Sequence, residues 1–420
     1  MNSKLHDDMI AMGDKAIVAA HALSSLNSGT KSAILLAMAD ELEARSATLK
    51  DANASDMKAA RADGLSPAML DRLQLTDDRI SAMVRGLHDV AGLRDPVGTR
   101  ISRWIRPNGL VIAKVRVPIG VIGIIYEARP NVTADAAGLC IKTSNAVILR
   151  GGKESLNSNL AIAAAMQSGG TTKGLPPDAI QIISTTDRDA VTELVRLEGR
   201  VDLIIPRGGE SLIRSVTEQA LVPVIKHYKG VCHTYVDKDA DLEMALRICE
   251  NAKCQRPGTC NAMESLLVHA KVAPQFLPLL AKRFSDLEVE LRGDAAARTI
   301  VPAMKEATEE DWSTEYLALK LSVKVVASTE DATAHINRYG THHSDAIISG
   351  NKSAQKLFLQ RVDSAAVYVN ASTRFTDGGE FGMGAEIGIS TDKLHARGPM
   401  GLEELTSYKY HINGNGQVRD

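Results

Sequence analysis

Residues 119–371 alternate between short apolar runs and longer helical patterns, and this alternation constrains the fold more than any other feature of the chain. Short apolar runs between helical segments are typical of a parallel sheet covered on both faces. The sequence therefore predicts an α/β protein. The expected strands are 121–126, 146–149, 179–183, 201–205, 231–236, 265–268, 322–326, 346–348 and 366–369, and the expected helices are 132–142, 154–167, 187–197, 209–220, 240–252, 273–284, 331–339 and 352–361.

The length and the flanking segments suggest two α/β domains with an added ribbon. A chain of 420 residues exceeds what one hydrophobic core usually holds, and we expect the joint near 225–230. Before the alternation, helical patterns cover 30–63, which ends at Gly64, and 76–90. Residues 102–118 are rich in β-branched side chains around Asn108-Gly109, a hairpin signal. The strand-like tail is expected to pair with this ribbon, in the same chain or on a partner subunit.

Charge and cysteine content exclude several classes of protein. The 49 basic and 51 acidic side chains nearly cancel and form no basic stripe, so we predict no nucleic-acid partner. Five irregularly spaced cysteines fit reduced thiols better than a disulfide framework. The N-terminus has acids and no secretory h-region, and the longest apolar stretch, 117–126, is about half of what a bilayer needs. We predict a cytoplasmic protein with no membrane span.

Paired glycines follow two of the expected strands. One strand runs into Arg150-Gly151-Gly152-Lys153 and another into Arg207-Gly208-Gly209. Glycine lets a ligand approach the backbone, and the next helix begins with N–H groups that favour an anion. Taken singly, each junction is better explained as a tight turn with solvated charges than as a ligand-binding site. The two together, each with an arginine, favour a phosphorylated ligand such as a dinucleotide.

Cys260 is the candidate working thiol. It follows Pro257-Gly258-Thr259 in a loop, and Arg256 is near enough in sequence to favour a thiolate. Against this, a free cysteine is more often a buried, unreactive side chain. Cys254 ends a helical pattern and fits packing. Local chemistry alone favours Cys260 only modestly and leaves its reaction open. The remaining cysteines lie within helical or strand patterns, which suits core filling: Cys140, Cys232 and Cys249.

A histidine pair is the only other cluster with metal-ligand chemistry. His342-His343 follows the helix that carries His335, but no carboxylate or third ligand occurs at helical or hairpin spacing. We therefore predict no metal, and expect the pair to lie at the surface or to contact substrate.

Several long segments resemble the γ-glutamyl phosphate reductases (glutamate-5-semialdehyde dehydrogenases) of the aldehyde dehydrogenase superfamily. They are "YEARPNVTADAAGLCIKTSNAVILRGGKES", "VPVIKHYKGVCHTYVD", "QRPGTCNAMESLLVH", "HINRYGTHHSDAI" and "EFGMGAEIGISTDKLHARGPMGLEELTSYK". The resemblance implies an aldehyde dehydrogenase-like fold in which two parallel-sheet domains are joined by an oligomerisation ribbon. The implied parts are an NADPH-binding domain at 1–101 and 119–228, a catalytic domain at 229–371, a ribbon and tail at 102–118 and 398–420, and a connection at 372–397.

The resemblance also assigns site residues. It makes Cys260 the nucleophile, puts the amide of Asn131 in the oxyanion hole, and puts Glu315 on the nicotinamide ribose. Hydrolytic relatives carry a water-activating glutamate where this chain has "VIKHYKG", with His227 or Lys226 near that place. A site without that carboxylate suits a thioester that is reduced. At the adenosine ribose, Arg150 and Lys153 suit the 2′-phosphate of NADPH, and Gly208 and Gly209 complete the cofactor site.

The implied reaction is reduction of L-γ-glutamyl 5-phosphate to L-glutamate 5-semialdehyde by NADPH, with release of phosphate, the second step of proline biosynthesis. Arg129, Arg256 and Lys226 are candidates for binding the acyl phosphate or the α-carboxylate, although salt bridges explain them about as well. The expected partners are further copies of the chain, as a dimer or larger, and the upstream glutamate kinase. The alternatives are an NAD-dependent, hydrolytic semialdehyde dehydrogenase and a non-catalytic protein on this fold.

Overall fold

The computed structural model describes residues 3–419, and the chain divides into two compact units. Unit 1 comprises the described parts of Met1–Lys226, Gly382–Gly388 and Met400–Asp420, and unit 2 comprises His227–Phe381 and Ile389–Pro399. The chain passes between them after Lys226, which lies in the range 225–230 expected for the joint and two residues before the implied domain boundary at 228. Residues 1, 2 and 420 of the predicted terminal segments lie outside the described residues.

A four-stranded parallel sheet forms the centre of unit 1. The strand order is β5-β4-β3-β6, and every pairing is parallel. Strands β3 and β4 are buried along their whole length, as their continuous apolar sequences predict for strands covered on both faces. The strands are β3 (Val121–Tyr126), β4 (Ala146–Arg150), β5 (Ile180–Ile182) and β6 (Leu203–Arg207).

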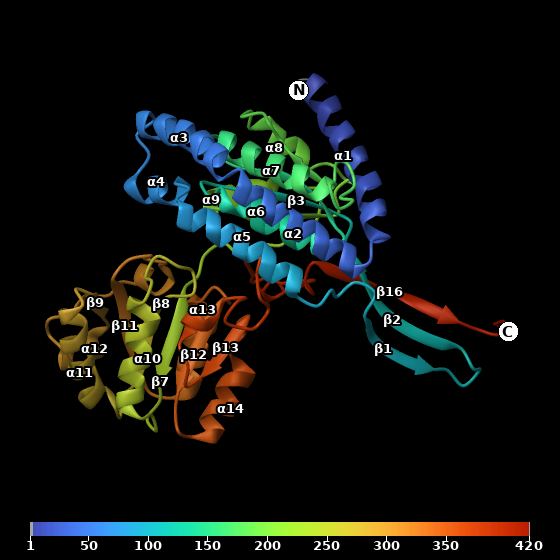
Figure 1. Cartoon of the computed structure of the whole chain (residues 1–420). Helices are drawn as coiled ribbons and strands as arrows, with labels where there is room; N and C mark the ends of the chain where they lie inside the picture. Colours follow the sequence, from blue (N-terminus) through green and yellow to red (C-terminus); the bar gives the residue numbers. More distant parts are fainter. Residues whose placement is uncertain (1–2, 420) are drawn as a thin grey trace. The chain divides into compact units, whose positions relative to one another are not determined.

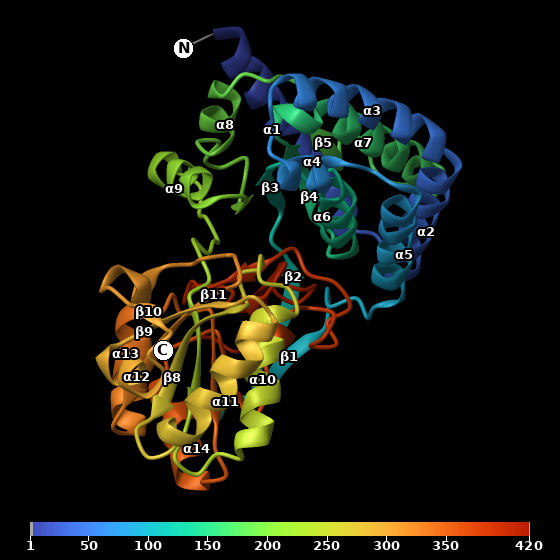
Figure 2. The ribbon, with the colours of Figure 1, turned by 90° about the vertical axis from the view of Figure 1, so that its left-hand side faces the viewer.

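Helices cover this sheet in two layers (Figure 2). Helices α1, α6 and α7 pack on the strands, α9 packs on β6, and α2, α3 and α5 pack on α6 and α7. Gly169 of α7 allows the close approach of α2, since a Cβ there would lie 2.2 Å from the carbonyl oxygen of Ala37. The helices of unit 1 are α1 (Ser3–Ser24), α2 (Ser28–Ala44), α3 (Ser46–Ala62), α4 (Pro67–Leu73), α5 (Asp77–Gly92), α6 (Asn131–Lys142), η1 (Lys153–Ser155), α7 (Leu156–Thr171), α8 (Asp189–Leu194) and α9 (Glu210–Gln219).

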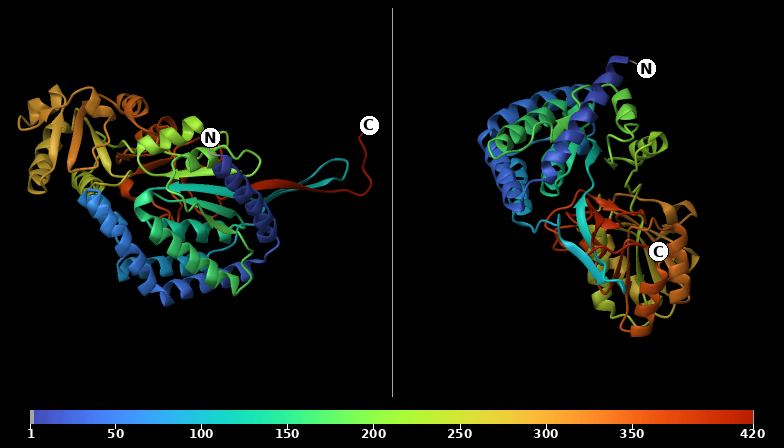
Figure 3. Two further views of the ribbon diagram at one scale, coloured as in Figure 1. Left: turned by 90° about the horizontal axis from the view of Figure 1, so that it is seen from above. Right: turned by 90° about the vertical axis from the view of Figure 1, so that its right-hand side faces the viewer.

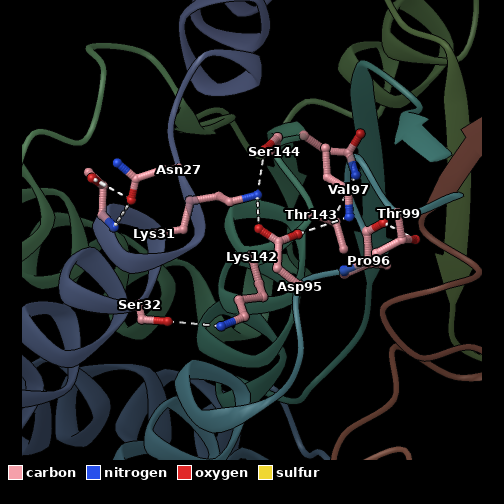
Figure 4. Close-up of polar contacts among 12 residues, drawn as sticks. Asn27, Lys31, Ser32, Asp95, Pro96, Val97, Thr99, Lys142, Thr143 and Ser144 are labelled. Carbon is pink, nitrogen blue, oxygen red and sulfur yellow. Dashed lines mark hydrogen bonds and ion pairs between the residues drawn. The ribbon is translucent and has the colours of Figure 1, made fainter. Parts of the chain in front are cut away.

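A buried ion pair and a second buried lysine fasten the segment that leads into the ribbon (Figure 4). Lys31 of α2 lies 2.5 Å from the carboxylate of Asp95 and donates to the hydroxyl of Ser144 at 2.9 Å. Lys142 of α6 donates to the carbonyl oxygen of Ala91 at 2.7 Å, and burial lowers its pKa. Because buried charges are costly unless they are paired, this cluster fixes residues 91–97 against α2 and α6.

An antiparallel ribbon extends from unit 1 as a long arm (Figure 3). Strand β1 (Arg100–Ile105) pairs with β2 (Val111–Pro118), and Gly109 takes the positive φ of +88° that the Asn-Gly turn predicts. Strand β16 (Thr406–Asn413) pairs with the other edge of β2, from Thr406 opposite Pro118 to Asn413 opposite Val111. The predicted pairing of tail and ribbon is confirmed, and here it occurs within one chain.

Unit 2 contains a seven-stranded parallel sheet (Figure 1). Neighbouring residues of one strand face different cores: Leu266 packs with α10, α11 and α12, and Leu267 packs with α13 and α14. The sheet order is β10-β9-β11-β8-β7-β12-β13. The strands are β7 (Cys232–Val236), β8 (Met263–His269), β9 (Glu290–Gly293), β10 (Lys305–Glu306), β11 (Lys320–Val326), β12 (Ser344–Ile348) and β13 (Ala366–Val369), with a separate pair β14 (Ile389–Ser390) and β15 (Gly398–Pro399). The helices are α10 (Leu242–Cys254), α11 (Ala273–Asp286), α12 (Ala295–Ile300), η2 (Glu310–Ser313), α13 (Thr329–Tyr339), α14 (Lys352–Arg361) and η3 (Thr373–Phe375).

The predicted elements are recovered, and the structure adds others that the sequence analysis does not name, among them α1, α4, β14 and β15. The helix expected over 30–63 is two helices, because the chain bends at Arg45, which caps the end of α2 and the start of α3. The elements β9, α12 and β10 were not predicted, since each is too short for its periodicity to stand out. Within residues 3–419, no helix combines the length and the apolar character needed to span a bilayer.

Candidate active site

The site in unit 2 is built at the amino ends of four neighbouring strands. Strands β11, β8, β7 and β12 lie side by side and run parallel, so the residues that precede them meet at one edge of the sheet. Those residues include Glu315 before β11, Cys260 before β8, Gly230 before β7 and His343 before β12. The topology thus gathers side chains that are far apart in the sequence.

The turn that carries Cys260 is closed at its base by a buried ion pair. The ammonium of Lys253, near the end of α10, lies 2.5 Å from the carboxylate of Glu264 in β8, and both side chains are fully buried. Burial raises the pKa of Glu264 to about 7 and lowers the pKa of Lys253, while each partner opposes the shift of the other. The second oxygen of Glu264 accepts the N–H of Leu317 at 3.0 Å, so this pair also ties the turn to the segment before β11.

Gly230 packs against the backbone of Cys260 more closely than any other residue type allows. A Cβ at Gly230 would lie 1.7 Å from the carbonyl oxygen of Cys260 and 2.8 Å from its Cα. The N–H of Gly230 donates to the carboxylate of Glu315 at 2.8 Å. Glu315, predicted on the nicotinamide ribose, therefore also holds the strand that supports the thiol.

Two imidazoles lie beside the Cys260 thiol. One ligand atom each of His227, Cys260 and His343 lies within 4.8 Å of the other two. The rings of His227 and His343 meet edge to face, with centroids 5.7 Å apart. The Nδ1 of His343 is 2.9 Å from the hydroxyl of Ser344, which in turn is 2.6 Å from the hydroxyl of Thr376. Cys260 is half-buried, as is His227, whereas His343 is buried.

The other cysteines occupy packing positions. Burial raises the pKa of Cys140 in α6, of Cys249 in α10 and of Cys232 in β7. The thiol of Cys232 lies 3.2 Å from the carbonyl oxygen of Cys260, to which it donates. Cys254 is the last residue of α10. Cys260 alone of the five lies in a turn outside helix and strand, which agrees with its choice from the sequence.

Cationic side chains flank the Cys260 turn. Arg256 is exposed. Arg374 in η3 is half-buried and donates to Gln255 at 2.8 Å and also to the side-chain oxygen of Asn261. Burial lowers the pKa of Arg374, and its charge interacts with Arg256 and Cys260. Arg374 was not singled out from the sequence, because the contact depends on a fold that returns residue 374 to residue 261.

Unit 1 contains the predicted oxyanion-hole residue, Asn131, and two of the predicted anion-binding residues, Arg129 and Lys226. The amide of Asn131, the first residue of α6, donates to the carboxylate of Asp135 at 2.9 Å. Burial raises the pKa of Asp135 to about 6. Arg129 is exposed just before α6, and Lys226 is the last residue of this part of unit 1.

The predicted cofactor residues of unit 1 lie at or just after the carboxyl ends of β4 and β6. These strands flank β3, and the strand order reverses between β3 and β6, where sheets of this type bind ligands. Gly209 caps α9, and its N–H donates to the carboxylate of Glu127 at 3.0 Å, so this helix start already holds an anion. The Nε of Arg150 is buried without a hydrogen-bond partner, and Lys153 is exposed, 3.1 Å from Asp63.

Comparison with known proteins agrees with this architecture. Residues 3–320 match the model of the aldehyde dehydrogenase family. The chain is 58% identical over 407 residues to a γ-glutamyl phosphate reductase of Moorella thermoacetica, covering 97% of each, and 55% identical over 405 residues to that of Caldanaerobacter subterraneus, covering 96% and 98%. It belongs to the γ-glutamyl phosphate reductases of the aldehyde dehydrogenase family. The crystal structure of the reductase from Thermotoga maritima superposes with a TM-score of 0.96 at 47% identity, covering 98% of this chain and 100% of that one.

The structure of this γ-glutamyl phosphate reductase corrects part of the prediction for the histidine pair. The pair His342-His343 is predicted to lie at the surface or to contact substrate, and the surface alternative is wrong for His343, which is fully buried beside Cys260 and His227, whereas His342 is partly exposed. Contact of His343 with substrate stays a prediction. His335 lies elsewhere, against the rings of His233, Trp312 and Tyr339. His343 directly precedes an apolar strand, as Cys260 nearly does, but only the sheet order reveals that the two strands flank β7.

Proposed function

We propose that this protein reduces L-γ-glutamyl 5-phosphate to L-glutamate 5-semialdehyde through a thioester on Cys260, as the second step of proline biosynthesis. The chain is a γ-glutamyl phosphate reductase, and such enzymes use NADPH. The observation that carries the thioester proposal is the position of His227. This imidazole lies beside the Cys260 thiol in the segment where hydrolytic relatives carry a glutamate. The segment Val224–Gly230 contains no carboxylate that could activate water, which favours an acyl group that survives to be reduced.

The chain's own residues account for formation of the thioester. The half-buried His227 takes the proton of the Cys260 thiol, and the thiolate attacks the acyl carbon. A C–S bond forms, the bond from the acyl carbon to the phosphate oxygen breaks, and phosphate leaves with that electron pair. We assign the developing oxyanion to the amide of Asn131 and the N–H of Cys260. When bound, the dinucleotide supplies the hydride that reduces this thioester to the aldehyde and frees the thiolate.

Residues of unit 1 fit the dinucleotide. The start of α9 at Gly208-Gly209 accepts negative charge, as its bond to Glu127 indicates, and a Cβ at Gly208 would lie 2.6 Å from that carboxylate. The buried Nε of Arg150 offers an unused donor, and Lys153 adds an exposed cation after the same strand. We propose that Arg150 and Lys153 bind the 2′-phosphate of NADPH and that Glu315 contacts the nicotinamide ribose.

Four cations are proposed for the substrate's anionic groups. Arg256 and Arg374 flank the thiol in unit 2, and the half-buried Arg374 is oriented by its bonds to Gln255 and Asn261. Arg129 and Lys226 belong to unit 1. Guanidinium groups bind phosphate and carboxylate in a bidentate manner, so we assign the acyl phosphate to the arginines beside Cys260.

We also propose that the ribbon joins copies of the chain. Its outer strands expose an unusual number of large apolar side chains, which favours burial against another subunit. We also propose the upstream glutamate kinase as a partner. The odd number of cysteines favours a cytoplasmic location. The exposed apolar residues of the ribbon are Ile101, Trp104, Ile105, Tyr408, Tyr410 and Ile412.

The reverse reaction tests the proposed function. Purified protein receives glutamate-5-semialdehyde and NADP with and without phosphate. We expect NADPH to form in catalytic amounts only with phosphate, to disappear in Cys260→Ala, and to persist in the control Cys254→Ala. Oxidation that ignores phosphate would show a hydrolytic dehydrogenase instead, and full activity in Cys260→Ala would remove this thiol from the mechanism.

A further inference from the structure

We propose that Cys260, His227 and His343 form a binding site for a divalent transition-metal ion, Zn²⁺, and that metal bound there reversibly blocks the thiol. One ligand atom of each residue lies within 4.8 Å of the others. Thiolate and imidazole are the ligands that zinc prefers. The sequence prediction of no metal considered His335, His342 and His343 together, and the structure instead brings His343 to two residues distant in the chain.

The distances suit tetrahedral zinc after a small movement. Zinc–sulfur and zinc–nitrogen bonds of ordinary length place ligand atoms about 3.3–3.6 Å apart in a tetrahedron. From separations of up to 4.8 Å, the three atoms must therefore approach one another by up to about 1.5 Å. Cys260 and His227 are half-buried and lie outside helices and strands, so side-chain rotation can supply this movement.

The third ligand is held in place by its surroundings. His343 precedes β12, and its Nδ1 lies 2.9 Å from the hydroxyl of Ser344, which contacts the hydroxyl of Thr376 at 2.6 Å. Metal-bound histidines usually have their other ring nitrogen fixed by such a partner. A ring held through Nδ1 presents Nε2 to the metal, beside the edge-on ring of His227.

Three protein ligands leave the fourth zinc position open for water. Coordination breaks the S–H bond of Cys260 and forms an S–Zn bond, and the proton passes to water. The charges of Arg374 and Arg256 near the turn oppose a second cation, which favours reversible binding over a permanent structural site. The block on catalysis rests on the proposed role of Cys260, whereas the site itself does not.

Cobalt titration of the full-length protein tests the site directly. We expect wild type to bind one Co²⁺ with a thiolate-to-cobalt charge-transfer absorption. Cys260→Ser should abolish this band, and His227→Gln or His343→Gln should weaken cobalt binding at least about tenfold. The matched controls Cys254→Ser and His342→Gln should bind as wild type does.

Several outcomes would overturn the proposal. Absence of the band in wild type, its persistence in Cys260→Ser, or unchanged affinity in the histidine variants would each do so. If circular dichroism shows His343→Gln misfolded, the half-buried His227→Gln decides. Zn²⁺ should also abolish phosphate-dependent activity and EDTA restore it, so zinc binding without inhibition contradicts the blocking role. A protein inactive before zinc is added would contradict the proposed function, and the cobalt band would still report the site.

Discussion

Replacing Gly230 by alanine should disable the site while leaving the fold intact. The Cβ of alanine would lie 1.7 Å from the carbonyl oxygen of Cys260, and real Cβ contacts essentially never fall under 3.0 Å. The carbonyl must therefore move by more than about 1 Å, because overlap on this scale is not tolerated in a packed interior. That carbonyl accepts a bond from the Cys232 thiol, and the N–H of Gly230 is held by Glu315, so neither side yields freely.

The expected magnitudes follow from this displacement. Overpacking of this kind costs about 1–3 kcal/mol of folding free energy, which a two-unit protein withstands. A displacement of about 1 Å at a nucleophile can lower kcat about 100-fold. The KM for NADP should change less than kcat, because Gly230 contacts only Glu315 among the proposed dinucleotide residues, whereas Arg150 and Lys153 belong to unit 1.

The assay is the phosphate-dependent formation of NADPH, with urea denaturation to measure stability. Gly258→Ala is the matched control, since it lies in the same turn and its nearest neighbour would be the Leu317 oxygen at an ordinary 3.9 Å. We expect Gly258→Ala to retain activity within a few-fold. If Gly230→Ala also keeps kcat within twofold of wild type, the close support of Cys260 by this glycine is not needed for catalysis.

Three further predictions concern the ion pair, the buried imidazole and the cofactor. Lys253→Met should cost about 3–5 kcal/mol, since it leaves the carboxyl group of Glu264 buried without the partner that stabilises its ionised form. The double variant with Glu264→Leu should recover most of that loss in urea denaturation, and equal losses in the two variants would contradict the account. Burial lowers the pKa of His335 to about 3, so its contribution to stability is complete above about pH 6.5 and declines as pH falls towards 3. Wild type should thus lose about 2 kcal/mol more than His335→Phe between pH 7 and pH 5, whereas parallel pH profiles would refute the shift. Lys153→Glu should raise the KM for NADPH at least about tenfold, because it places a negative charge beside the 2′-phosphate. The KM for NADH, which has no 2′-phosphate, should rise much less. Equal changes in the two KM values would remove Lys153 from the 2′-phosphate site.

Most of the fold was predictable because its strands are short, apolar and separated by helices of ordinary length. Strands β3 and β13 have the predicted bounds, and the Asn108-Gly109 turn forms the expected hairpin. The break at Arg45 was not visible, since a single bent residue leaves the helical composition on both sides unchanged. The β9–α12–β10 region was missed because none of its elements is long enough to show a period.

The site was predictable only where local sequence carries the chemistry. Cys260 stands out by its turn, and the paired glycines by their place after strands. The proximity of His343 and Arg374 to Cys260 arises from strand order and from a distant return of the chain, neither of which has a local signal. Gly230 carries no signal either, since its need for a bare Cα comes from the backbone of another strand.

The thioester on Cys260 is the central claim, and mass spectrometry of the acylated enzyme tests it most directly. The protein is mixed with glutamate-5-semialdehyde and NADP without phosphate, digested, and the peptide that contains Cys260 is weighed. We predict a glutamyl adduct on Cys260, absent from Cys254, that disappears when phosphate is added. Phosphate-dependent turnover by an enzyme whose Cys260 stays unmodified would contradict the mechanism.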